Sequence, residues 1–215
     1  MDKVINLGIP HIREQIFENI DTDELLQYLK VSHTWKILAE RVLLKRWKNR
    51  IFEACFSGKT RIVQLVLEHS ANTGNTKDLR IELNAIEQNG GTAFMAACYN
   101  GHKDVVQLLL NLPDKTIELN ARRTNNGTTA FMAACHNAHK DVVQLLLNYP
   151  DKTIDLNARK DDGTTAFMLA CNNGHTDVVQ LFLLYTEKII ELNTRDQYGG
   201  TALMWACING HKDVV

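Results

Sequence analysis

The sequence predicts an all-α solenoid of paired antiparallel helices, preceded by a small helical module. The string GTAFMAACYNGHKDVVQLLL (91–110) returns twice almost unchanged and once more in a shortened form that stops at Val215. An asparagine stands at the same point of each copy, at intervals of 36, 37 and 36 residues: Asn84, Asn120, Asn157 and Asn193. Self-similarity at a period of about 20 to 50 residues is typical of stacked repeats.

Each repeat is expected to hold two helices joined by a tight turn. The segment TAFMAAC is apolar on most sides, as a helix packed between neighbours requires. After the turn, KDVVQLLL (103–110) places its valines and last two leucines on one helical face. Gly101 fits the left-handed residue that ends a helix, as do the glycines at the equivalent turns. One copy carries Ala138 in place of this glycine. For that copy we expect either local strain or a turn of different geometry.

The repeats resemble the ankyrin repeat family, whose signature is Gly-x-Thr-Pro-Leu-His-x-Ala, then Gly-His, then Val-Val-x-Leu-Leu-Leu. The resemblance runs from Arg50 to Val215. Thr92 and its equivalents stand at the motif threonine, but Ala replaces the motif proline and Met95, Met132, Met168 and Met204 replace the motif histidine. In the family that histidine hydrogen-bonds between turns, so its loss implies apolar filling in its place. The period exceeds the ankyrin value of about 33, which predicts a longer loop or an extra half turn after each second helix.

The resemblance implies a division into a helical module at 1–49 and ankyrin repeats at 50–215, the repeats being 50–83, 84–119, 120–156, 157–192 and 193–215. The first repeat is divergent and is followed by a polar insertion, ANTGNTKDLR (71–80). The last repeat stops at Val215, midway through its second helix. Because a terminal repeat needs a polar cap, we expect the natural protein to continue beyond this residue.

The first 49 residues resemble an F-box, the helical module that docks on the Skp1 subunit of cullin-RING ubiquitin ligases. The family pattern is Leu-Pro, Ile-Phe-x-x-Leu-Asp, Leu-Leu and Val-Ser-x-x-Trp-x-x-Leu-Ala. Its spacing is matched without a gap from Phe17 onward, whereas the interval before Ile16 is one residue short. The resemblance implies that a Skp1-like subunit is contacted by Pro10, Ile16, Phe17, Leu25, Leu26, Val31, Trp35 and Leu38.

These patterns support a substrate-recruiting adaptor of a Skp1–cullin–F-box ubiquitin ligase, and two alternatives remain open beside it. The same apolar stripes suit a helical cap over the open end of the solenoid, in which case the chain is a non-catalytic ankyrin scaffold. In the third interpretation an enzyme domain follows Val215 and this part of the chain is its targeting arm.

The client protein is expected in the groove that ankyrin proteins form from loop tips and first-helix faces. Positions shared by the copies serve stacking, while divergent positions are free to serve a partner. By resemblance the groove contacts are Arg122, Arg123, Tyr99, His136, Leu169, Asn172, Tyr198, Trp205 and Ile208. Aromatic residues and arginine dominate interface hot spots, which favours Tyr99, Trp205, Tyr198 and Arg123.

Other function classes lack support in the sequence. The net charge of -1 provides no field toward nucleic acid or an anionic membrane. No Gly-rich phosphate loop is present, and no Ser, His and Asp set stands outside the repeat frame, so we expect no enzyme activity, cofactor or small-molecule substrate. The five cysteines follow the repeat, at spacings of 43, 37, 36 and 36 residues, which predicts reduced structural thiols rather than a disulfide framework or a metal site.

The N-terminus lacks the apolar core of a secretory signal, and no stretch approaches the roughly 18 apolar residues of a membrane span. We therefore expect a monomer in the cytoplasm, with the nucleus as an alternative. If the source is a virus or an intracellular bacterium, we expect the host cytosol.

Overall fold

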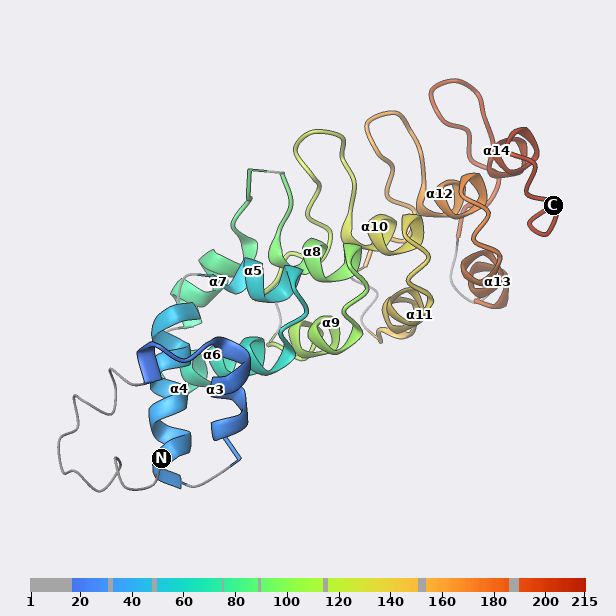
Figure 1. Cartoon of the computed structure of the whole chain (residues 1–215). Coiled ribbons are helices and arrows are strands. Elements are labelled where there is room, and N and C mark those ends of the chain that lie inside the picture. Colours follow the sequence, from blue (N-terminus) through green and yellow to red (C-terminus); the bar gives the residue numbers. More distant parts are fainter. Residues whose placement is uncertain are drawn as a thin grey trace.

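The computed structural model describes residues 17–30, 33–47, 50–74, 76–88, 90–113, 116–150, 154–185 and 190–215. Within these ranges the regular structure is helical and no β-strand forms. Figure 1 shows an elongated solenoid in which paired helices follow one another and long loops project to one side. The predicted all-α ankyrin-repeat solenoid is therefore confirmed.

Two rows of helices run along the solenoid. The first helices of the pairs are α5 (Ile51–Phe56), α8 (Ala93–Tyr99), α10 (Ala130–His136), α12 (Ala166–Asn172) and α14 (Ala202–Ile208). The second helices form the other row (Figure 1) and are α6 (Thr60–Thr73), α9 (Lys103–Leu110), α11 (Lys140–Asn148) and α13 (Thr176–Leu184). The helices of each pair from α5 to α13 pack on each other, and successive helices pack within each row, from α5 to α14 and from α6 to α13.

The projecting loops are called fingers below: residues 85–88 with 90–92 before α8, 121–129 before α10, 158–165 before α12 and 194–201 before α14. Each finger ends at the repeat threonine, which begins the first helix. The hydroxyl oxygens of Thr92, Thr129, Thr165 and Thr201 each accept a hydrogen bond from the N–H of the methionine three residues on, at 3.3–3.4 Å. Such a cap stabilises a helix by about 1 kcal/mol.

The methionine at the motif-histidine position also joins this polar network in one copy. The Sδ atom of Met132 accepts a hydrogen bond from the Thr129 N–H at 3.5 Å, closing a capping box. Both residues are buried. The apolar filling predicted from the sequence is thus accompanied by a weak acceptor where the histidine would stand.

The turn after each first helix has the same left-handed geometry in every repeat. Its φ is 66° at Gly58, 72° at Gly101, 69° at Gly174 and 71° at Gly210, and Ala138 follows the glycines with a φ of 57°. Of the two predicted outcomes the structure shows strain rather than a different turn. A residue with a Cβ in this region costs roughly 1–2 kcal/mol.

The repeats are tied together by side chains that reach the neighbouring repeat. The Nε2 atoms of His102, His139, His175 and His211 lie 2.8–3.0 Å from a backbone carbonyl oxygen at the end of the preceding first helix. Since a carbonyl only accepts, Nε2 is the protonated nitrogen. The side-chain oxygens of Asn84, Asn120 and Asn157 each accept a hydrogen bond at 2.9 Å from the backbone N–H of the residue two positions before the next asparagine of the series.

The segment predicted as a polar insertion is largely helical. Helix α6 continues to Thr73 and ends at Gly74, which has a φ of 70°. Helix α7 (Thr76–Asn84) follows and packs on α5 and α6. Its Leu79 and Leu83, four residues apart, are 6% and 1% exposed, so one helical face is buried. The prediction missed this apolar pair among polar neighbours.

Before the repeats, α3 (Thr22–Tyr28) and α4 (His33–Trp47) form the described part of the N-terminal module. The carboxylate of Asp21 caps α3, because it accepts hydrogen bonds from the backbone N–H groups of Asp23 and Glu24. Helix α4 packs on α6. Lys59, which stands where later repeats carry their linking histidine, donates a hydrogen bond to Asp23 at 3.1 Å. The described part of the module thus contacts the first repeat through α6 and Lys59.

The residues assigned to Skp1 contact differ in exposure. Phe17 and Leu25 are 3% and 0% exposed and belong to the core that continues into the repeats, so here they pack within the chain and offer no contact surface. Leu26 and Leu38 are partly buried against that core and remain accessible in part. Pro10, Ile16, Val31 and the side chain of Trp35 lie outside the described residues.

The five cysteines are free thiols. Cys207 is exposed, and the other four are buried: Cys55, Cys98, Cys135 and Cys171. Burial raises the pKa of Cys55 and Cys171 to about 12, which suppresses the reactive thiolate. Among the described residues no cluster of three or more His, Cys, Asp or Glu side chains suits a metal ion. In the same part of the chain no helix combines the length and the apolar character that crossing a membrane demands.

Candidate protein-binding groove

A groove lies where the fingers meet the first helices. It encloses about 540 Å³ and is lined by side chains of α5, α8, α10 and α12 and by residues of the first three fingers. That volume is within the range of about 300 to 1,000 Å³ found for ligand pockets. The groove therefore has room for a few side chains of a partner.

Small residues hollow the groove over α8 and α10. Ala96 and Ala133 line it, and the equivalent positions in the next two repeats carry Leu169 and Trp205. Leu169 still lines the groove, whereas Trp205 does not. The change from alanine to leucine and tryptophan along one row of positions thus sets where the groove ends.

Aromatic side chains form the rim of the groove at its N-terminal end. The rings of Phe52 and Phe56 are stacked, with centroids 6.3 Å apart and planes at 20°. Phe56 and Tyr99 occupy equivalent positions in successive repeats, and each is 47% exposed. Both line the groove together with Met95, which is buried. This rim offers the apolar anchor points typical of interface hot spots.

Basic side chains of the fingers face the same groove. Arg123 is half-buried, and Lys160 has a side chain that is 19% exposed. The Lys160 ammonium donates a hydrogen bond to Asp162 at 3.2 Å. Burial alone would raise the pKa of Asp162, but hydrogen bonds from Thr164 and Lys160 lower it by more, so the pKa lies below its ordinary value. This carboxylate is ionised at neutral pH and holds the lysine in place.

His136 completes the basic side of the groove as a neutral imidazole. Its pKa is lowered, first by burial and then by the nearby charges of His175 and Lys160. The amide nitrogen of Asn173 lies 2.9 Å from Nδ1. Because an amide N–H₂ only donates, Nδ1 accepts and Nε2 carries the proton. His136 thus presents a hydrogen-bond donor.

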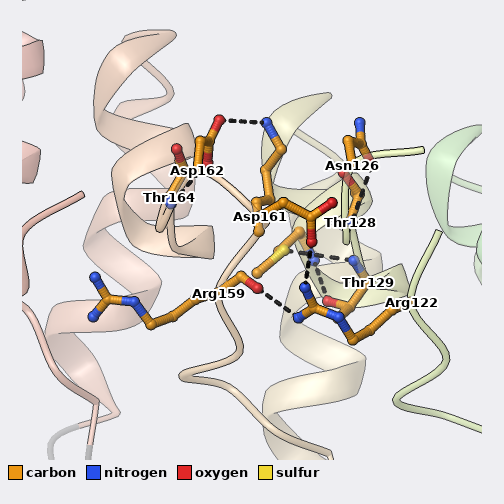
Figure 2. Close-up of polar contacts among 10 residues, drawn as sticks. Arg122, Asn126, Thr128, Thr129, Arg159, Asp161, Asp162 and Thr164 are labelled. Carbon is orange, nitrogen blue, oxygen red and sulfur yellow. Dashed lines mark hydrogen bonds and ion pairs between the residues drawn. The ribbon is translucent and has the colours of Figure 1, made fainter. Parts of the chain in front are cut away.

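Arg122, predicted as a client contact, instead links neighbouring fingers. Figure 2 shows its guanidinium directed at the next finger, where it donates to the Asp161 carboxylate at 2.8 Å and to the Arg159 carbonyl at 2.5 Å. Arg159 donates in the same way to the Arg195 carbonyl. The alignment of these three arginines in successive repeats is the sequence signal for a stacking role, and it was overlooked.

Leu169 lines the groove, but the other predicted contacts in the last two repeats lie beyond it and have mixed roles: Asn172, Tyr198, Trp205 and Ile208. The Trp205 indole N–H donates to Asp196 at 2.8 Å, and this carboxylate also accepts from the backbone N–H of Tyr198 and Gly200. The Asn172 carbonyl accepts from Asn209 and His211, which is a stacking role. Only two of these predicted contacts are widely exposed, at 78% and 72%: Tyr198 and Ile208.

The structure therefore brings together four of the nine predicted client contacts in one groove: Tyr99, Arg123, His136 and Leu169. Phe52, Phe56 and Lys160 line it as well but were not among the predicted contacts. The sequence signal for Phe56 is its alignment with Tyr99, because the divergent first repeat places it at the same position.

Stacked helix pairs with projecting fingers, and a groove lined by aromatic and basic residues, define a protein–protein interaction module. A family model described as ankyrin repeats (3 copies) matches residues 21–116, 51–160 and 153–215. The chain belongs to the ankyrin repeat family. Proteins of this family are in general non-catalytic interaction modules, and no enzyme family is indicated for this chain.

The chain is also similar to osteoclast-stimulating factor 1 of Monopterus albus. The two are 42% identical over 53 residues, which cover 22% of this chain and 25% of that protein. The chain thus matches about a quarter of the length of this curated relative.

Proposed function

We propose that the chain recruits a client protein in the groove and presents it to a Skp1–cullin–F-box ubiquitin ligase through the N-terminal module. The groove carries the first half of this proposal, because exposed aromatic side chains and basic groups converge there on a hollow of about 540 Å³. The client contacts that the groove supports are Phe56, Tyr99, Arg123, His136, Lys160 and Leu169.

The N-terminal module supports the second half through its surface beside the F-box-like pattern. Leu26 and Leu38 are partly buried, and the adjacent Ile37 is 44% exposed. Apolar side chains on the outside of a small helical module are typical of a docking surface. Phe17 and Leu25 are buried in the interior, whereas Ile37 is exposed, so a substitution at Ile37 leaves these core residues in place.

Titration calorimetry of the purified chain with recombinant Skp1 tests the adaptor role. We expect micromolar or tighter binding, which corresponds to about -8 kcal/mol. Ile37→Glu should abolish it, while Ile81→Glu, which changes a 61% exposed isoleucine on α7, should leave it intact. Both variants alter an exposed side chain, and circular dichroism verifies that both stay folded. An absence of Skp1 binding by the folded chain refutes this role.

The groove is tested separately by Ala133→Leu. The next repeat carries Leu169 at the same position, so the fold accommodates leucine there while the added side chain fills the hollow. Client proteins captured from a lysate by the unaltered chain should be lost from this variant. Retention of the same clients by the folded variant refutes binding in the groove.

A second candidate function is a plain ankyrin scaffold in which the N-terminal helices only cap the solenoid. The hydrogen bond between Lys59 and Asp23 and the packing of α4 on α6 favour it, and the family match begins at residue 21, within the proposed F-box-like module at 1–49. Under this alternative, removal of residues 1–49 destabilises the repeats at 50–215, and Skp1 binding is absent throughout.

A further inference from the structure

The groove has a one-sided electrostatic character that the whole chain lacks. Among the described residues that line it, the basic side chains are Arg123, His136 and Lys160, and none of the lining side chains is a carboxylate. The complete sequence is nearly balanced, with 24 Lys and Arg against 25 Asp and Glu. The basic lining is therefore a local property of this surface and does not follow from composition.

We infer that the groove selects a short acidic segment of the client protein, one that places an aromatic or large aliphatic side chain next to its carboxylates. This inference rests on the proposed function, in which the groove binds the client. It adds the chemistry of the segment that is bound.

The carboxylates of the segment are matched by donors on the fingers. An ammonium has three N–H donors and a guanidinium has five. The hydrogen bond between Lys160 and Asp162 uses one of the lysine donors and fixes the ammonium beside the groove. A second carboxylate on the open side can share this cation, as charge-assisted hydrogen bonds commonly do.

The behaviour of His136 is a second sign of positive potential at this surface. After burial, the charges that lower its pKa are those of His175 and Lys160. A bound carboxylate would oppose these charges and accept from the Nε2–H. The imidazole therefore supports an acidic ligand in its neutral form and more strongly once it is protonated.

The apolar part of the segment is matched by the rim and floor of the groove. Phe56 and Tyr99 are each 47% exposed, and Ala96 is 8% exposed between larger neighbours. An apolar side chain placed here would cover the two rings. Burial of such a side chain removes apolar surface from water and so favours binding.

The same basic residues do not suit nucleic acid. The groove holds two permanently charged cations, Arg123 and Lys160, and the second is shared with Asp162. Proteins that bind a phosphate backbone tightly make on the order of 6–10 phosphate contacts. The apolar floor also favours an amino-acid side chain, so a protein segment fits the groove better.

Selection from random peptides displayed on phage tests this inference with the whole chain of residues 1–215. Peptides enriched on the unaltered chain but not on Ala133→Leu define the ligands of the groove. We expect these peptides to combine Asp or Glu with Phe, Trp, Tyr or Leu. The strongest peptide is then synthesised, and fluorescence anisotropy measures its dissociation constant.

Charge variants then separate a local contact from a general electrostatic effect. Arg123→Ala and Lys160→Ala should each weaken binding of the selected peptide by about tenfold, equal to about 1.4 kcal/mol. Lys103→Ala removes an exposed cation from α9, in the other row of helices, and should leave the dissociation constant unchanged.

Each result of the selection decides one question. Groove peptides that are neutral or basic overturn the inference and leave the proposed client binding in place. A failure to enrich any groove peptide overturns both. Binding of a single-stranded oligothymidylate more tightly than the selected peptide also overturns the inference, since it would assign the basic lining to nucleic acid.

Discussion

Ala138 is a strained residue whose replacement by glycine should stabilise the protein. Its φ of 57° lies in the left-handed region that the equivalent turns fill with glycine. Relief of this conformation contributes roughly 1–2 kcal/mol. The greater freedom of glycine in the unfolded chain offsets about 0.4–1 kcal/mol of that. We therefore expect Ala138→Gly to raise the free energy of unfolding by about 0.8 kcal/mol, the difference between the midpoints of these two ranges.

Gly101→Ala is the matched control, because it creates the same residue at the equivalent turn. There an added Cβ would clash with Nδ1 of His139, a linking histidine, so this variant combines strain with displacement of the ring. We expect it to destabilise the protein by more than about 1 kcal/mol.

Thermal and urea unfolding followed by circular dichroism measure both changes. In a protein of this size a change of about 1 kcal/mol moves Tm by about 2–4 °C. A neutral or destabilising effect of Ala138→Gly would falsify the assignment of strain to this turn. If Gly101→Ala is harmless, the linking histidine moves aside more easily than its hydrogen bond suggests.

Three further predictions concern single side chains. At neutral pH iodoacetamide should label Cys207 in the folded chain and spare the buried Cys55, because burial raises the pKa of Cys55 to about 12. Mass spectrometry of peptides measures the labelling, and equal labelling of the two thiols would contradict the packing. Acidification from neutral pH should destabilise the protein in part through His136, because its folded pKa is below the ordinary value of 6.5 and the unfolded state therefore binds more protons. His136→Gln should lessen this loss of stability, which urea unfolding at several pH values measures. An unchanged pH dependence would refute the assignment. Arg122→Ala should lower the free energy of unfolding by less than about 1 kcal/mol, since the ion pair with Asp161 is exposed, and should leave binding of groove peptides unaltered; a marked loss of peptide binding would return Arg122 to the groove.

The repeat made most of the fold predictable from the sequence. Helix pairs, their capping threonines and the left-handed turns recur, so several copies report on each feature. Helix α7 appears in a segment with no second copy, and its two buried leucines were not enough to outweigh its polar composition. Prediction from internal comparison fails where a segment has nothing to be compared with.

The groove was only partly predictable because divergence between copies has two physical causes. Tyr99 and Leu169 differ from their equivalents and do line the groove. Trp205 and Asp196 also differ, yet they bond to each other across nine residues of sequence. Two residues that differ from their equivalents because they bond to each other cannot be told, in a single sequence, from two residues that differ because they bind a partner. The fold is needed to separate them.

The linking histidines give the junctions between repeats a direction and a common form. Each of these imidazoles meets a carbonyl of the preceding unit, and the chemistry is the same at each of the four junctions that the structure describes. A duplicate of residues 120–156 inserted after residue 156 would therefore find matching donors and acceptors at both of its ends. In evolutionary terms such a chain can lengthen or shorten by whole units, since recombination between copies leaves every junction already complementary.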